Sequence, residues 1–132
     1  MTNKELLKVA EEFGTPVYVY DVQSIAEQYR KLTDAFSRQT RFFYAAKALT
    51  NINILKYVEK LGASLDCVSI NEVKLGLKAG FPHQRVLFTP NCVDLKEIED
   101  AMALGVHINI DNISILEQFG NKYGDSYPIF VR

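Results

Sequence analysis

The sequence predicts an α/β fold in which parallel strands alternate with helices. Short apolar runs begin near Arg41, Ser64, Arg85, Val106 and Pro128, each about 20 to 23 residues after the one before. A helical pattern fills each gap, which is the crossover that two parallel neighbours require. With 132 residues, of which 48% are hydrophobic, the chain can bury a core between helices and sheet.

A helix, a strand and a second helix are predicted before this series of alternating strands and helices, which we call the ladder. Thr2 and Glu5 have the spacing of a capping box, which predicts a helix that ends at Gly14. Residues 16–20 are β-branched and aromatic, and they predict a strand. Asp21 is expected to cap the second helix. Its apolar positions are Val22, Ile25, Ala26, Tyr29, Leu32 and Phe36.

The ladder itself has recognisable boundaries. The strands are predicted near 41–46, 64–68, 86–89, 106–110 and 128–132. The helices between them carry capping-box pairs at the start and glycines at the end, where a left-handed residue is needed. These are Ser69 with Glu72, Asp94 with Glu97, and Gly62, Gly80 and Gly105.

Two architectures fit this ladder. A five-stranded flavodoxin-like domain would be complete at this length, whereas a (β/α)8 barrel needs roughly 200 residues or more. A flavodoxin-like sheet normally closes with a helix after its fifth strand, but this chain stops inside the apolar run 128–132. We therefore expect a partial (β/α)8 TIM barrel, truncated after about five parallel strands with intervening helices.

Charge and composition argue against several classes of protein. Fifteen Lys and Arg residues against sixteen Asp and Glu are scattered along the chain, which disfavours binding to nucleic acid or to an anionic membrane. Cys67 and Cys92 lack the spacing of a zinc site or a disulfide framework, so we expect no metal and a reducing compartment. The N-terminus is charged and no apolar stretch approaches a membrane span. We expect a cytoplasmic protein.

Lys47 is the first candidate functional residue. In both architectures ligands bind at the carboxyl ends of the strands, and Lys47 follows the first ladder strand between Ala46 and Ala48. Among these small side chains we expect the lysine to be only partly hydrated, which favours the neutral amine that forms a Schiff base. The alternative is a surface lysine whose stem passes the alanines to reach water.

The next strands bring further candidates. Asp66 is a carboxylate within an apolar run, so it needs a partner, either a cationic group of a site or a neighbouring Lys or Arg. Glu72 is either a ligand or half of the capping box with Ser69. Weaker candidates follow the third and fourth strands: Asn91, Cys92 and Asp111, the last of which could instead cap the next helix.

Four segments occur in register along the chain. They are Thr15 to Asp21, Tyr44 to Ala48, Leu65 to Ser69 with Glu72, and Ala79 with Gly80. Their order and spacing resemble the pyridoxal-phosphate decarboxylases of the alanine-racemase-like barrel class, and among them the diaminopimelate decarboxylases. The resemblance covers essentially the whole chain, through Arg85 to Phe88, Ile108 to Asn112 and Phe130 to Arg132.

This resemblance implies a pyridoxal 5'-phosphate cofactor and a role for each matching residue. Lys47 matches the catalytic lysine that forms the Schiff base with the cofactor. Ala45 and Asp66 match residues beside the cofactor ring, and Glu72 matches a carboxylate near the same site. Residues 1–132 would then form the N-terminal portion of a cofactor-binding barrel. Within them, 1–21 would be a lead-in segment that contacts a second, β-rich domain, so the strand at 16–20 should lie outside the barrel wall.

The resemblance also implies an activity: release of CO2 from meso-diaminopimelate to give L-lysine, by a homodimer. Ile70 and Asn71 stand where a glycine pair is usual, and Thr89 to Cys92 also depart from the family pattern, which leaves an ornithine- or carboxynorspermidine-type decarboxylase as the alternative. A small non-catalytic flavodoxin-like binding domain is the alternative from another class. The phosphate loop and the cysteine offered across the dimer are expected beyond Arg132, so residues 1–132 alone should be inactive.

Overall fold

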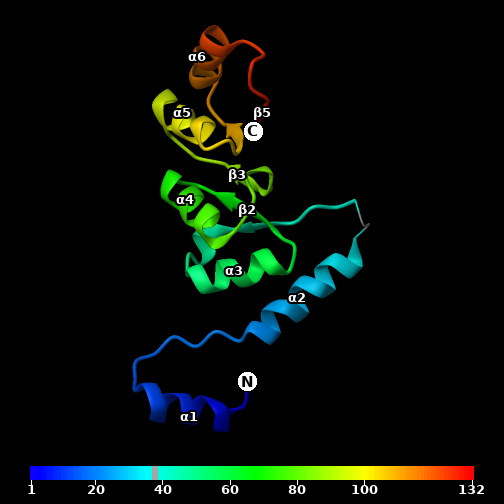
Figure 1. The fold of residues 1–132 in the computed structure, drawn as a ribbon, viewed down its shortest axis with the longest axis vertical. Helices are drawn as coiled ribbons and strands as arrows, with labels where there is room; N and C mark the ends of the chain where they lie inside the picture. Colours follow the sequence, from blue (N-terminus) through cyan, green and yellow to red (C-terminus); the bar gives the residue numbers. More distant parts are fainter. Residues whose placement is uncertain (37–38) are drawn as a thin grey trace. The chain divides into compact units, whose positions relative to one another are not determined.

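The computed structural model describes residues 1–36 and 39–132, and the chain divides into two compact units, 1–38 and 39–132. The first unit holds helices α1 (Asn3–Phe13) and α2 (Val22–Ala35). The second unit holds five strands, with helices between them. Figure 1 colours the chain from its N-terminus to its C-terminus through both units. In the described part of the chain, no helix combines the length and the apolar composition that crossing a membrane requires.

The two helices of the first unit begin where the sequence predicts. Thr2 Oγ1 accepts a hydrogen bond from the N–H of Glu5, whose carboxylate accepts one from the N–H of Thr2 at 2.6 Å, so the capping box is present. Asp21 Oδ1 accepts from the N–H groups of Gln23 and Ser24 at 3.0 and 3.2 Å. Hydrogen bonds from the N-terminal ammonium group and from the Ser24 backbone lower the pKa of Asp21 to about 2.

The strand predicted over 16–20 is wrong. This segment is irregular and takes no part in the sheet, and its Val17, Tyr18 and Tyr20 side chains are exposed. β-branched and aromatic residues favour a strand only where a neighbour pairs with the backbone N–H and C=O groups. Within the described residues, no strand pairs with this segment, so its local preference for β structure has no effect.

The second unit is a parallel sheet in sequential order, β1-β2-β3-β4-β5. Sequential order is that of a barrel wall and confirms the partial TIM barrel, whereas the 2-1-3-4-5 order of a flavodoxin-like sheet is ruled out. The strands are β1 (Phe43–Ala45), β2 (Ser64–Cys67), β3 (Val86–Phe88), β4 (His107–Ile110) and β5 (Ile129–Val131), each shorter than the predicted run.

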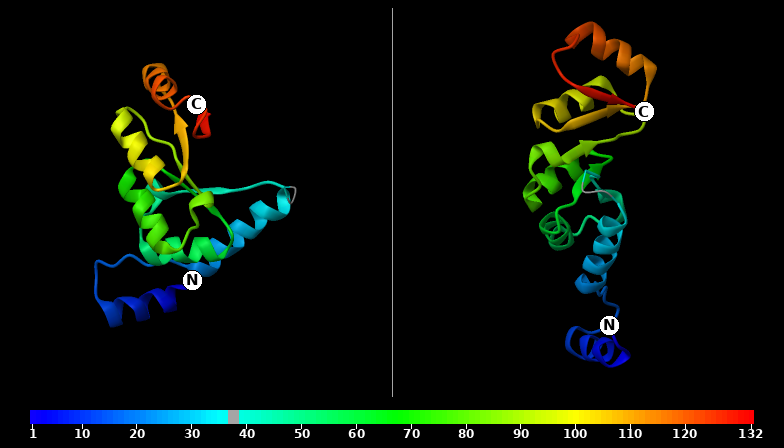
Figure 2. Two further views of the ribbon diagram at one scale, coloured as in Figure 1. Left: turned by 45° about the horizontal axis from the view of Figure 1, so that its top comes forward. Right: turned by 90° about the vertical axis from the view of Figure 1, so that its right-hand side faces the viewer.

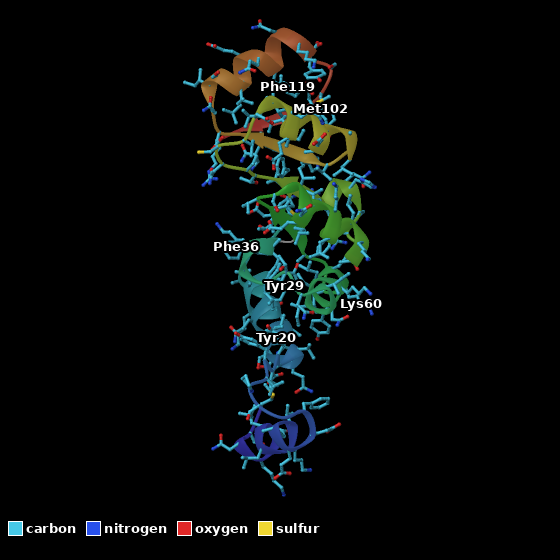
Figure 3. The ribbon with its side chains drawn as sticks, turned by 90° about the vertical axis from the view of Figure 1, so that its left-hand side faces the viewer. Tyr20, Tyr29, Phe36, Lys60, Met102 and Phe119 are labelled. Atoms are coloured by element: carbon cyan, nitrogen blue, oxygen red, sulfur yellow. The ribbon has the colours of Figure 1, made fainter. Side chains whose placement is uncertain are left out.

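Each connection contains a helix that returns the chain to the start of the next strand, which Figure 2 lets the reader follow from β3 through α5 and β4 to α6. The helices are α3 (Ile52–Lys60), α4 (Ile70–Ala79), α5 (Leu95–Ala103) and α6 (Ile113–Tyr123), with short 3-10 turns η1 (Ala46–Ala48) and η2 (His83–Arg85). Neighbouring helices pack on one another, and Figure 3 labels Met102 on α5 and the buried Phe119 on α6.

The strands have one sealed face and one open face. Every second residue is fully or almost fully buried, and this side packs on the helices: Leu65, Cys67, Val86, Phe88, Ile108 and Ile110. A Cβ atom on Gly76 of α4 would overlap the Leu65 side chain, which shows how closely α4 approaches β2. The alternate residues face away from the helices, toward the side that forms the interior in a barrel.

Arg85 joins two connections at the amino end of the sheet. Its guanidinium group pairs with Glu59 Oε1 at 3.3 Å and donates to the carbonyl oxygens of Glu59, at 3.1 Å, and Ala63. These atoms belong to the end of α3 and to the turn before β2, while Arg85 leads into β3. Because an arginine side chain offers several donors in a fixed plane, one residue can hold both segments.

We predict opposite effects for two glycine-to-alanine changes within helices. Gly76→Ala should destabilise the protein by about 1 to 3 kcal/mol, because the new methyl group meets the fully buried Leu65. The matched control, Gly120→Ala in α6, has open space around its Cβ position and should stabilise by about 0.5 to 1 kcal/mol. Urea unfolding followed by circular dichroism compares the two. A stabilising Gly76→Ala would contradict the close approach of α4 to β2.

Candidate functional site

The carboxyl end of β1 turns at once into the 3-10 turn η1, which places Lys47 at the end of the sheet. The N–H of Leu49 donates to the carbonyl of Ala46 at 3.1 Å and closes this turn. Ala46 is fully buried on the helix side, while Lys47 is exposed. This exposure agrees with the alternative of a surface lysine, and the partial hydration expected of the amine stays a prediction. The amine is accessible to a reactant from solvent.

Asp66 lies directly beside the start of this turn. The register pairs Ala45 of β1 with Asp66 of β2, so both residues lie on the open face of the sheet. Ala45 comes two residues before Lys47, and Asp66 is the last residue but one of β2. The Asp66 carboxylate is half buried, and its Oδ1 atom is buried without a hydrogen-bond partner among the described residues. Asp66 therefore forms no ion pair with a neighbouring Lys or Arg through Oδ1, which was one of the two expectations for this residue.

Glu72 holds the turn between β2 and α4. Its N–H donates to Ser69 Oγ at 3.3 Å, as the predicted cap requires. Its carboxylate, however, accepts from the N–H of Val68 at 2.7 Å and not from that of Ser69, so the reciprocal half of the capping box is shifted by one residue. The carboxylate of Glu72 is thereby fixed at the end of β2, and its role toward a cofactor stays a prediction.

The two cysteines occupy opposite environments. Cys67 lies on the sealed face of β2, where burial, assisted by the charges of Glu72 and Asp66, raises the pKa of its thiol far above the ordinary value. Cys92 is exposed in the loop after β3 with a φ of 56°. Neither is placed beside Lys47 by strand register: Cys67 faces the helices, and Cys92 follows a strand two places away.

The weaker candidates are exposed at the same edge of the sheet. Asn91 lies in the loop after β3 and Asp111 follows β4. The cap of α6 is Asn112 and not Asp111, because Asn112 Oδ1 accepts from the N–H groups of Ser114 and Ile115 at 2.8 and 3.3 Å. An Asx side chain caps only from the residue just before the helix, and that position belongs to Asn112.

Two polar residues on the open face were not predicted as site residues, although one of them, Thr89, begins the atypical segment Thr89 to Cys92. Thr89 directly follows β3 and Asn109 lies in β4, and both Thr89 Oγ1 and Asn109 Oδ1 are buried without a partner among the described residues. For Asn109, the sequence does contain one indication: it is a polar residue between Ile108 and Ile110, both buried, so strand alternation places it on the opposite face. Together with Asp66 they form a row of unpartnered oxygen atoms across β2, β3 and β4.

These features are typical of a class of protein, the barrel domains that bind a small organic molecule at the carboxyl ends of their strands. In this chain an accessible lysine and a carboxylate lie on adjacent strands. An amine can bond an aldehyde, and the unpartnered oxygens can accept hydrogen bonds from the same molecule. Within residues 1–36 and 39–132, no group of three His, Cys, Asp or Glu side chains could hold a metal ion.

Comparison with known proteins identifies the family. Residues 22–132 match the pyridoxal-dependent decarboxylase family, in its pyridoxal binding domain, and the chain belongs to this family. It is 43% identical over 115 residues to a diaminopimelate decarboxylase of Methanothermobacter thermautotrophicus, which covers 85% of this chain and 27% of that protein. It is 33% identical over 135 residues to the Bacillus subtilis enzyme of the same name, which covers 97% and 31%.

Solved structures agree with this assignment. Lysine/ornithine decarboxylase from Vibrio vulnificus, complexed with putrescine, superimposes with a TM-score of 0.87 at 29% identity, over 98% of this chain and 35% of that one. Diaminopimelate decarboxylase from Helicobacter pylori, complexed with L-lysine, gives 0.76 at 30% identity, over 93% and 32%. The chain thus spans about a third of the length of these relatives. The predicted family resemblance is confirmed.

We predict that a thiol reagent distinguishes the two cysteines. Iodoacetamide should alkylate Cys92 in the native protein, because its side chain is exposed, and should spare Cys67, which is buried and held in the unreactive thiol form. Peptide mass mapping before and after unfolding in urea measures both sites. Cys92→Ser provides the control, since it should leave no rapidly labelled cysteine within residues 1–132. Rapid native labelling of Cys67 would contradict the sealed face of β2.

Proposed function

We propose that this chain is the N-terminal, cofactor-binding part of a pyridoxal-phosphate-dependent decarboxylase that converts meso-diaminopimelate to L-lysine and CO2. The observation that carries the proposal is the exposed Lys47 at the end of β1, beside the Ala45 and Asp66 pair on the open face. The named relatives support the substrate, because diaminopimelate decarboxylases match 85% and 97% of this chain.

The residues present fit the cofactor. Lys47 Nζ is the accessible amine to which the cofactor aldehyde would be bonded, and it can be displaced by the amine of an incoming amino acid. Asp66 Oδ1 is buried and unpartnered, so it can accept a hydrogen bond from the bound molecule. Ala45, on the same face, presents only a methyl group and leaves room beside it.

When bound, the cofactor ring supplies an electron sink for the pair of electrons that remains on the substrate when CO2 leaves. The chain's own contribution is orientation. Glu72 fixes the turn after β2 through the Val68 N–H, which keeps the neighbouring Asp66 in place. Lys47 can carry a proton to or from the reacting amino group, because its side chain is exposed at the strand end.

A second substrate class has its own support. The lysine/ornithine decarboxylase of Vibrio vulnificus superimposes with a higher TM-score, 0.87, than the Helicobacter pylori diaminopimelate decarboxylase at 0.76. Ornithine and lysine are therefore competing substrates, and carboxynorspermidine is the further alternative that the family resemblance leaves open.

We further propose that the whole protein acts in the cytoplasm as a homodimer and binds no nucleic acid. The free thiols of Cys67 and Cys92, the balanced charge and the family resemblance support this.

We predict that Lys47 carries the cofactor. Borohydride reduction of the protein at its natural length, loaded with pyridoxal phosphate, should leave a pyridoxyl group on Lys47, located by peptide mass mapping. Lys56 and Lys74, which are also exposed but lie on α3 and α4, are internal controls and should remain unmodified. Lys47→Arg should abolish the adduct, because a guanidinium group does not form the bond. A specific adduct on Lys56 or Lys74 would refute the assignment.

The proposed substrate is tested by comparing CO2 release from meso-diaminopimelate, ornithine, lysine and carboxynorspermidine with the same natural-length protein. We expect the highest kcat/KM with meso-diaminopimelate. Residues 1–132 alone should release no CO2 from any of them, because the chain spans about a third of the relatives and the rest of the site lies elsewhere. A clear preference for ornithine or carboxynorspermidine would refute the substrate but leave the reaction class intact.

A further inference from the structure

We propose that Thr89 and Asn109 are contact residues of the same site, which hold the bound cofactor or amino acid from β3 and β4. The inference rests on the proposed function, since it names further residues for the molecule that Lys47 would carry. Neither residue belongs to the set that the family resemblance assigns. Both come from the positions of unpartnered polar atoms on the open face of the sheet.

The first step is the common face. Leu65 lies against Gly76 of α4, so Asp66, the next residue, faces away from the helices. The N–H of Thr89 donates to the carbonyl of Cys67 at 2.7 Å, which continues the β2–β3 ladder past Phe88. Thr89 therefore lies on the face of Asp66, because strand residues alternate and Phe88 is on the sealed side.

Asn109 continues the row on the next strand. The register pairs Phe88 with Ile108, so the residues one step further, Thr89 and Asn109, are neighbours across β3 and β4. Neighbouring strands lie about 4.8 Å apart, so one small molecule lying across the strand ends can reach side chains on several of them. The row thus leads from the Lys47 end of the sheet across to β4.

The second step concerns energy. A buried polar atom without a partner destabilises a fold, and natural proteins hold few of them. Three such oxygen atoms on one face, near the carboxyl ends of β2, β3 and β4, indicate that a bound molecule supplies the partners. Asp66 Oδ1 and Asn109 Oδ1 can only accept hydrogen bonds, and Thr89 Oγ1 can accept or donate. The matching molecule must therefore present hydrogen-bond donors, such as a protonated nitrogen.

Ser64 offers a matched control. Its Oγ atom is also buried without a partner among the described residues, on the same strand and the same face as Asp66. It lies at the opposite, amino end of β2, away from the end that carries Lys47. A role in the fold alone would make Ser64 and Thr89 equivalent, whereas a role in the site affects Thr89 and Asn109 only.

The experiment uses the natural-length protein with Thr89→Val, Asn109→Leu and the control Ser64→Ala. The dissociation constant of pyridoxal phosphate, measured by fluorescence titration, and the KM for the amino acid are determined separately. Thr89→Val and Asn109→Leu should raise one of these constants about three- to tenfold, while Ser64→Ala changes neither. A change in the cofactor constant assigns the donor to the cofactor, and a change in KM alone assigns it to the amino acid.

Thermal unfolding of the cofactor-free variants supplies the second readout. Without a partner to lose, Thr89→Val and Asn109→Leu should keep the Tm of the cofactor-free protein unchanged or raise it. Thr89→Ser, which keeps the hydroxyl group, should restore the constant that Thr89→Val changes. The proposal is overturned if both constants stay within the effect of Ser64→Ala, or if the cofactor-free Tm falls clearly. Labelling of Lys47 by borohydride tests the proposed function independently, since it requires neither side chain.

Discussion

The packing of α4 against β2 is the contact from which the arrangement of the site follows. Leu65 occupies the space that any side chain at position 76 would need, so its face of β2 lies tightly against α4. Because strand side chains alternate, the fixed position of Leu65 commits Asp66 to the opposite face. Through the parallel register, Ala45 of β1 lies on the same face as Asp66, and so do Thr89 after β3 and Asn109 of β4.

Much of the fold follows from short-range chemistry that a sequence displays. The caps at Thr2, Asp21, Ser69 and Asp94 each accept a backbone N–H in the first turn of a helix, as their positions predict. The spacing of the apolar runs predicts parallel strands in order. The segment 16–20 shows the limit of this reasoning. Its β-branched residues favour a strand, but a strand forms only where a second strand pairs with its backbone, and the local sequence does not show whether such a partner exists.

The sequence predicts where the candidate site residues lie along the strands better than it predicts what surrounds each side chain. Lys47, Asp66 and Ala45 were expected at neighbouring strand ends, and the β1–β2 register places Ala45 beside Asp66. Lys47 is exposed within the turn η1, and no residue type between Tyr44 and Leu49 indicates this turn. The shifted acceptor of Glu72 and the unpartnered atoms of Thr89 and Asn109 depend on three-dimensional neighbours, so a pattern of residue types does not reveal them.

The alternation of side chains along β2 also places a carboxylate and a thiol on opposite faces of the sheet. Asp66 and Cys67 are adjacent in sequence, yet the carboxylate lies on the open face and the thiol on the sealed one. The nearby carboxylates add to the effect of burial and raise the pKa of the thiol, so Cys67 cannot compete as a nucleophile. An inert thiol and an accessible amine can therefore lie on adjacent strands, because strand geometry directs them to different surroundings.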